Sequence, residues 1–207
     1  MPRKLSAAAS MCLFWAFIAC GISFFAPYWL QNQLAILDPA SKGEYRSNDF
    51  IFQTKLDPSI PLSRGLWAIC YDVCQGFWAD GYVLQINLFT NSKWHIATQV
   101  LYFVGCALLL MCEVFGKFQL ACRENRASYR ILGFGLMFSV MLQVAAIAVF
   151  GGGAYNSYAA ASVTRPRNAG DYYFGWAYWM AIPGAIMTLF SSILYIICDF
   201  WGFRDKL

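Results

Sequence analysis

The stretch RGLWAICYDVC, residues 64–74, places a Gly-Leu-Trp tripeptide and two cysteines in a polar segment of an otherwise apolar chain. Of the 207 residues, 59% are hydrophobic and 13% are charged. An ordinary soluble domain carries about 25% charged residues. On either side of the stretch lie long runs without any charge. The arrangement of those runs therefore decides on which side of a membrane the stretch lies.

Four uncharged runs are long enough to cross a bilayer, because about 20 apolar residues suffice for a spanning helix. They cover residues 5–37, 94–112, 131–164 and 172–198. We predict an all-α membrane protein with transmembrane helices at 7–28, 96–116, 131–151 and 174–198. A cleaved signal peptide is the alternative for the first run, but the run is longer than a usual signal core.

Eight of the fifteen basic residues flank these predicted helices on one side: Arg3, Lys4, Lys117, Arg123, Arg126, Arg130, Arg204 and Lys206. Short basic loops stay in the cytoplasm. We therefore expect cytoplasmic termini, with residues 31–93 and 152–172 as the first and second outer loops. Charges beside membrane ends favour contact with membrane lipid and argue against a nucleic-acid partner.

The first outer loop carries the pattern of short strands. Residues 81–89, GYVLQINLF, alternate apolar and polar side chains, which is typical of a half-buried strand. Residues 66–73, LWAICYDV, place Trp67, Ile69, Tyr71 and Val73 on one side. We expect a single domain, residues 1–207, in which a four-helix bundle carries a small antiparallel sheet from this loop.

Cys70 and Cys74 are the only two cysteines in the expected outer, oxidising region, so they are the natural disulfide pair. In a straight strand their Cα atoms would be about 13 Å apart, whereas a disulfide needs less than about 7 Å. The chain must then turn at residues 71–73. A zinc half-site and a redox pair are minor alternatives, because zinc needs more ligands and the single histidine, His95, lies at a membrane boundary.

Three other cysteines lie near the expected cytoplasmic ends of the spans: Cys112, Cys122 and Cys198. Juxtamembrane cysteines are candidate palmitoylation sites, and a buried free thiol is an equally good explanation for Cys112. Small residues at four-residue spacing predict helix–helix faces: Ala8, Cys12, Ala16 and Cys20, and Ala177, Ala181 and Ala185. Inside the spans, Gln99 and Gln143 are expected to form interhelical hydrogen bonds.

Motifs for catalysis are missing from the sequence. The glycine run at 151–153 lacks the lysine of a phosphate-binding loop. Glu113 and Asp199 lie at the expected cytoplasmic interface, where pairing with Lys117 or Arg204 explains them. Without a charge deep in the membrane, a transporter is also disfavoured. We expect no enzyme activity, no cofactor and no metal site, and a function in recognition.

The order Trp29, then Gly65-Leu66-Trp67, then Cys70 and Cys74, resembles the W…GLW…C…C pattern of the claudin, peripheral myelin protein and epithelial membrane protein superfamily. The resemblance extends to the four spans and to the aromatic entry to the last one, YYFGWAYWMAI, residues 172–182. It implies a left-handed bundle capped by a sheet from the first outer loop, with Trp67 at the membrane surface and the cysteines joining two strands. The chain differs from claudins in its closely spaced cysteines and in a longer insertion at 37–63.

The resemblance further implies a plasma-membrane protein of cell junctions, which forms or organises a paracellular barrier with itself and other four-span proteins. An auxiliary subunit of a channel or receptor, and a general adhesion protein, are the alternatives. Residues 205–207, DKL, resemble a ligand for a cytoplasmic scaffold. Tyrosine and arginine are enriched at interfaces, so candidate partner contacts in the second outer loop are Tyr155, Tyr158, Arg165 and Arg167.

Overall fold

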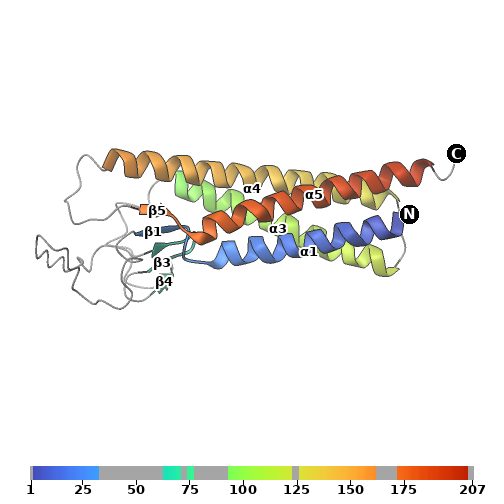
Figure 1. Cartoon of the computed structure of the whole chain (residues 1–207), viewed down its shortest axis with the longest axis horizontal. Helices are drawn as coiled ribbons and strands as arrows, with labels where there is room; N and C mark the ends of the chain where they lie inside the picture. Colours follow the sequence, from blue (N-terminus) through green and yellow to red (C-terminus); the bar gives the residue numbers. More distant parts are fainter. Residues whose placement is uncertain are drawn as a thin grey trace, which may run out of the picture.

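The computed structural model describes residues 2–32, 63–70, 74–76, 93–122, 126–161 and 172–204. These residues contain four long helices, each with a stretch long and apolar enough to cross a membrane. The helices are α1 (Pro2–Phe25), α3 (Lys93–Cys122), α4 (Arg126–Ala161) and α5 (Trp176–Arg204). They run alongside one another, with both chain termini at one end and the strands at the other (Figure 1). We call these the terminal end and the sheet end.

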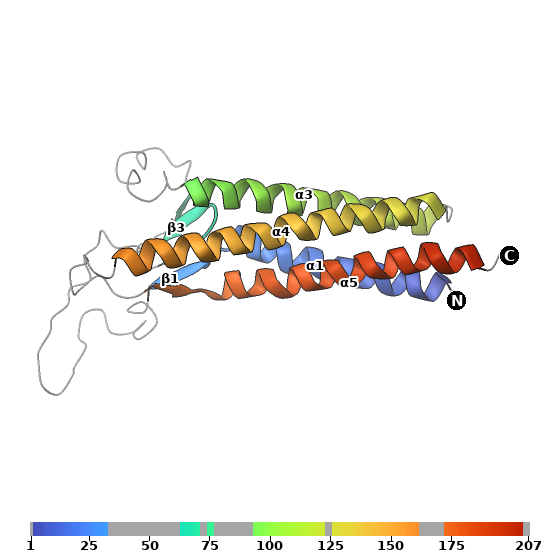
Figure 2. The ribbon, with the colours of Figure 1, turned by 90° about the horizontal axis from the view of Figure 1, so that it is seen from above.

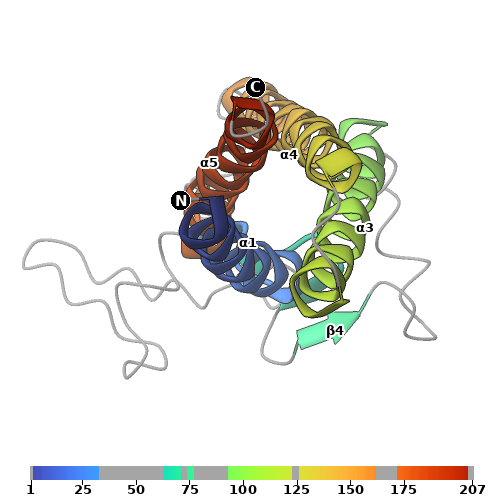
Figure 3. The same cartoon turned by 90° about the vertical axis from the view of Figure 1, so that its right-hand side faces the viewer.

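The helices form a ring in the order α1, α5, α4, α3 (Figure 3). Helix α5 packs along both α1 and α4, and α4 also packs along α3, whereas α1 and α3 have fewer contacts with each other. Figure 2 shows the same bundle from above, with α4 reaching past α5 at the sheet end.

The bundle has an apolar outside and a partly polar inside. Large side chains such as Met111, Phe134 and Phe190 are more than half exposed, while Ser139 and Gln143 are fully buried. A soluble protein rarely exposes apolar patches on this scale, and helices in lipid associate through small and polar residues. This distribution is the one expected of a multi-pass membrane protein, which the uncharged runs also predict.

Helix α4 differs most from its predicted span, because it continues for ten residues beyond position 151. Residues 152–161, expected to begin the second outer loop, are therefore helical. The glycines serve packing here: a Cβ on Gly151 would lie 2.7 Å from the hydroxyl of Tyr178, and one on Gly153 would collide with the indole of Trp94. Glycine at such positions lets neighbouring side chains approach the helix backbone.

Five short strands form one sheet in the order β4-β3-β2-β1-β5. They are β1 (Leu30–Asn32), β2 (Ser63–Arg64), β3 (Ala68–Cys70), β4 (Cys74–Gly76) and β5 (Tyr172–Phe174). Every pairing is antiparallel. The sheet was predicted from the first outer loop alone, and this is wrong for β5, which directly precedes α5. The strand predicted at 81–89 lies outside the described residues.

The predicted packing face is confirmed for α5, where Ala177, Ala181 and Ala185 are buried. It is wrong for the first half of α1, where Ala8 is exposed. The buried apolar residues of α1 are instead Ala9, Leu13, Ala16 and Cys20. Their 4-3-4 spacing follows the 3.6-residue turn, whereas a strict four-residue ladder drifts around the helix by about 40° per step.

The interhelical role predicted for Gln143 is confirmed, since its Oε1 accepts from Cys20 Sγ of α1 at 3.7 Å. Its Nε2 donates to Ser139 Oγ (3.3 Å), and that hydroxyl donates to the carbonyl oxygen of Gly105 on α3 at 2.7 Å. Three helices are thereby connected at mid-bundle. Gln99 acts differently, because it donates to the carbonyl oxygen of Leu66, outside the helices, at 2.6 Å.

Candidate functional site

The sheet end is built around Trp29, whose side chain is fully buried although it lies beyond the end of α1. Its indole packs edge-on against the rings of Tyr102, Phe150 and Tyr178, from α3, α4 and α5. The indole N–H donates to the carbonyl oxygen of Ser23 at 2.7 Å. Trp29 therefore contacts all four helices, which makes it the anchor of the sheet on the bundle.

The Gly-Leu-Trp tripeptide lies directly beside the end of α1. A Cβ on Gly65 would meet the Cα of Pro27 at 2.5 Å and the carbonyl oxygen of Ala26 at 2.6 Å, so glycine is required by this close approach. Leu66 is fully buried in the same cluster as Trp29. Trp67 is only half-buried, and it packs on Phe24 with ring centroids 5.2 Å apart.

Strand β1 is bonded along both of its edges. Leu30 pairs with Arg64 of β2 on one side and with Phe174 of β5 on the other. The pairing with β5 is tightened at Gly175, whose N–H donates to the carbonyl oxygen of Trp29 at 2.9 Å and where a Cβ would collide with the carbonyl oxygen of Tyr28. Both segments that connect the helices at this end are thus fixed to one strand.

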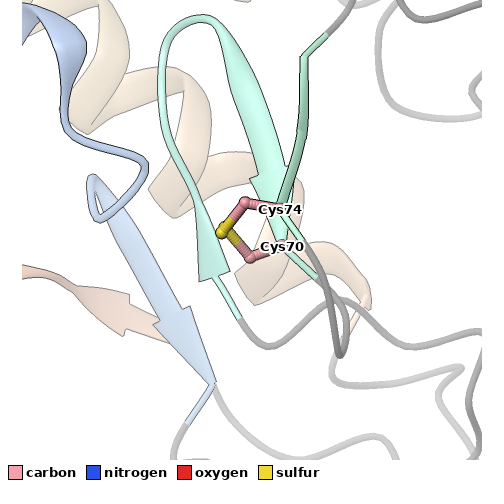
Figure 4. The surroundings of a disulfide bond; sticks show 2 residues. All are labelled: Cys70 and Cys74. Atoms are coloured by element: carbon pink, nitrogen blue, oxygen red, sulfur yellow. A yellow bond between two sulfur atoms is a disulfide. The ribbon is translucent and has the colours of Figure 1, made fainter.

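The other side of the sheet ends in a disulfide-bonded hairpin. Cys70 at the end of β3 pairs in register with Cys74 at the start of β4, and the two are joined by a disulfide with a Cα–Cα distance of 3.9 Å (Figure 4). The predicted pairing and the predicted change of chain direction agree with the structure. Residues 71–73, where the turn was expected, lie outside the described residues.

Two nitrogen-rich side chains lie between the sheet and the bundle. Arg64 is 3% exposed and His95 is 1% exposed, and they are close enough to interact electrostatically. Next to them, Gln99 holds the backbone of Leu66, as described above. On the edge strand β5, burial raises the pKa of the Tyr173 phenol.

Of the four candidate partner contacts, two lie on α4 and two lie outside the described residues. Tyr155 lies on the part of α4 beyond position 151 and is 70% exposed. Tyr158 lies on the same helix, and its side chain is outside the described part. Arg165 and Arg167 also lie outside the described residues. Of the four, Tyr155 is the one that the structure places on an exposed surface at the sheet end.

The candidate palmitoylation sites differ in accessibility. Cys198 is 3% exposed within the core at the terminal end, so acylation of Cys198 requires this packing to open. Cys112 is half-buried and faces α4, where a Cβ on Gly135 would lie 3.2 Å from its sulfur. Cys122 is the last residue of α3, and its side chain is not described.

Sequence reasoning identified Trp29 but not its central position, and it missed β5 with Gly175. The aromatic run at 172–182 was the available signal, although a three-residue strand is too short for an alternation pattern.

Within the described part of the chain, no three His, Cys, Asp or Glu side chains are grouped as a metal site requires. Comparison of the sequence with protein-family models and with curated proteins finds no match.

Proposed function

We propose that this protein acts at contacts between cells, where it forms or organises a paracellular barrier through the segments at its sheet end. The observation that supports this most is the joining of both connecting segments in one sheet, bonded to β1 and anchored by Trp29. A binding surface that is already ordered loses less conformational entropy when its partner binds. The resemblance in Trp29, Gly65-Leu66-Trp67 and the cysteine pair points to the same role.

In this proposal the protein lies in the plasma membrane with its termini in the cytoplasm. The basic residues Lys117 and Arg130 lie towards the terminal end of α3 and α4, which is the distribution expected on the cytoplasmic side. The sheet end then faces the space between cells. The partners are membrane lipid, further copies of this protein, and other four-span proteins on the same or the opposing membrane.

The test is expression of the tagged protein in epithelial cells grown in mixture with cells that lack it. Trans binding between copies predicts enrichment at borders between two expressing cells and not at borders with non-expressing cells. Transepithelial resistance of a fully expressing layer then measures the barrier. Uniform surface distribution, combined with stoichiometric co-purification of one channel protein, would contradict the junctional proposal and favour the auxiliary-subunit alternative.

The extended end of α4 allows a matched pair of variants. Tyr155 and Asn156 are adjacent and both exposed. We expect Tyr155→Ser to reduce enrichment at borders and Asn156→Ser to leave it unchanged, with equal surface amounts of both. An equal effect of the two variants would remove Tyr155 from the contact surface.

A further inference from the structure

A groove lies on the outer surface between α4 and α5 near the terminal end. It has a volume of about 380 Å³ and is lined by Arg130, Phe134, Ile196, Asp199 and Phe200. Phe134 and Phe200 are 61% and 69% exposed, so the groove opens away from the bundle interior. We call it the α4–α5 groove.

The inner side of the groove is closed by a close approach of the two helices. A Cβ on Gly133 would lie 2.6 Å from Cγ1 of Ile196, and the hydroxyl of Ser192 donates to the carbonyl oxygen of Gly133 at 2.8 Å. The groove is therefore a shallow site with a packed floor, and it does not lead into the bundle.

One charged pair lies at the polar side of the groove. Arg130 Nε donates to Asp199 Oδ2 at 2.9 Å, with the two side chains 67% and 12% exposed. The predicted pairing of Asp199 with Arg204 is not tested, because the side chain of Arg204 is not described. A guanidinium has five N–H donors, so the bond through Nε leaves both terminal nitrogens of Arg130 able to donate to a further acceptor. Asp199 meanwhile holds the guanidinium in position.

The order of groups along the groove matches that of a phospholipid. The candidate spans run from Ser128 to Asn156 and from Trp176 to Phe200, so Arg130 and Asp199 lie at the level where a span ends. Phe134 is one turn further into the span than Arg130. A phosphate at the level of Arg130 would thus be followed by apolar side chains, as a headgroup is followed by its acyl chains.

We propose that the α4–α5 groove binds one anionic phospholipid, with its phosphate on Arg130 and the upper part of an acyl chain against Phe134 and Ile196. Arginine is suited to phosphate because its planar fork donates two parallel hydrogen bonds. Charge favours an anionic lipid, since six basic residues and four acidic ones occur at 113–130 and 199–206. The assignment of this leaflet to the anionic, cytoplasmic side rests on the orientation proposed above, whereas the binding of the lipid to the groove does not.

The test uses the full-length protein, stripped of lipid in detergent and supplied with phosphatidylserine, phosphatidylethanolamine or phosphatidylcholine of identical acyl chains. Native mass spectrometry counts the lipids retained per protein. We expect one phosphatidylserine to be retained in preference to the others. Arg130→Gln should lower that occupancy about tenfold, the effect of losing charge-assisted hydrogen bonds to a phosphate.

Lys117→Gln is the matched control, because it removes one exposed positive charge from the same end of the bundle, and Lys117 lies on α3, outside the groove. Its effect should be less than about twofold. Equal losses in Arg130→Gln and Lys117→Gln would overturn the proposal, since they would show general attraction to a basic surface. Phe134→Ala should also lower phosphatidylserine occupancy, and unchanged occupancy in that variant would overturn the apolar half of the site.

Asp199→Asn distinguishes a zwitterionic headgroup from an anionic one. Asp199→Asn keeps an oxygen that can accept from Arg130 Nε and removes a negative charge beside the proposed phosphate, so this variant should retain or increase phosphatidylserine binding. A selective loss of phosphatidylethanolamine in this variant would show an amine on Asp199 and overturn the anionic assignment.

Thermal unfolding of each variant is measured alongside lipid binding. If Arg130→Gln does not fold, Arg130→Lys replaces it, because lysine keeps the positive charge and lacks the two parallel donors of the guanidinium. It should lose part of the phosphatidylserine occupancy, and full occupancy in Arg130→Lys would overturn bidentate binding.

Discussion

Ser23 of α1 donates a hydrogen bond from its hydroxyl to the carbonyl oxygen of Ala177 on α5, at 2.8 Å. The carbonyl oxygen of the same serine accepts from the indole of Trp29. Ser23 and Ala177 are both fully buried, so these bonds form where water does not compete. The first helix, the last helix and the sheet are thereby connected through one residue.

Trp29→Ala should therefore destabilise the protein more than truncation of any exposed tryptophan. Removal of a buried aromatic side chain costs about 3–5 kcal/mol, and the carbonyl oxygen of Ser23 also loses its donor. Thermal unfolding in detergent and the fraction delivered to the cell surface should both fall. Trp179→Ala, at a position that is 57% exposed, is the control, and equal unfolding midpoints for the two variants would refute the anchoring role.

Cys70 and Cys74 should both resist a membrane-impermeant maleimide on unreduced cells and react after reduction. Peptide mapping under non-reducing conditions should recover them as one linked species. Because the closed loop is short, Cys74→Ser should cost only about 2 kcal/mol in the chain-entropy model. Labelling of both thiols without reduction would contradict the bond.

Gly65→Ala should lower the unfolding midpoint, because the new methyl group would overlap backbone atoms of Ala26 and Pro27. Overpacking of this kind costs about 1–3 kcal/mol. Gly21→Ala is the matched control, since nothing lies within 4 Å of a Cβ there, and alanine is favoured over glycine in a helix by about 1 kcal/mol. If Gly65→Ala is as stable as Gly21→Ala, the close approach at the end of α1 is not required.

Gly152 and Gly153 provide a second pair within one helix. A Cβ on Gly152 meets nothing within 4 Å, whereas one on Gly153 would collide with the indole of Trp94. We expect Gly152→Ala to stabilise α4 slightly and Gly153→Ala to destabilise the protein, as measured by thermal unfolding. Stabilisation by both would show that Gly153 does not pack closely against Trp94 of α3.

The helices could be predicted from the sequence because a spanning helix needs little more than length and low charge. The glycine run at 151–153 could not be placed, since glycine marks both turns and close packing, and only the positions of Trp94 and Tyr178 decide between them. The Arg130–Asp199 pair was missed for a related reason. It joins α4 to α5, and no spacing in the sequence indicates which faces of two helices meet.

Part of the candidate site could be predicted because its residues are close together in the sequence. Cys70 and Cys74 are close in the chain, so compartment and reach were enough to pair them. The depth of Trp29 depends on rings from three helices distant in sequence. The pairing of Leu30 with Phe174 likewise joins two segments that are far apart in the sequence. Long-range contacts of this kind leave no local pattern.

The double pairing of β1 also determines the order in which the protein can be assembled during synthesis. Leu30 leaves the ribosome early, but Phe174 and Tyr178 follow only with the final helix. Until then Trp29 lacks part of its packing, and one edge of β1 has no β5 beside it. Unpaired strand edges can bind other chains, so we expect a chain that ends before β5 to leave this edge of β1 open to such pairing. Formation of β5 and α5 is then the last step that closes the sheet end.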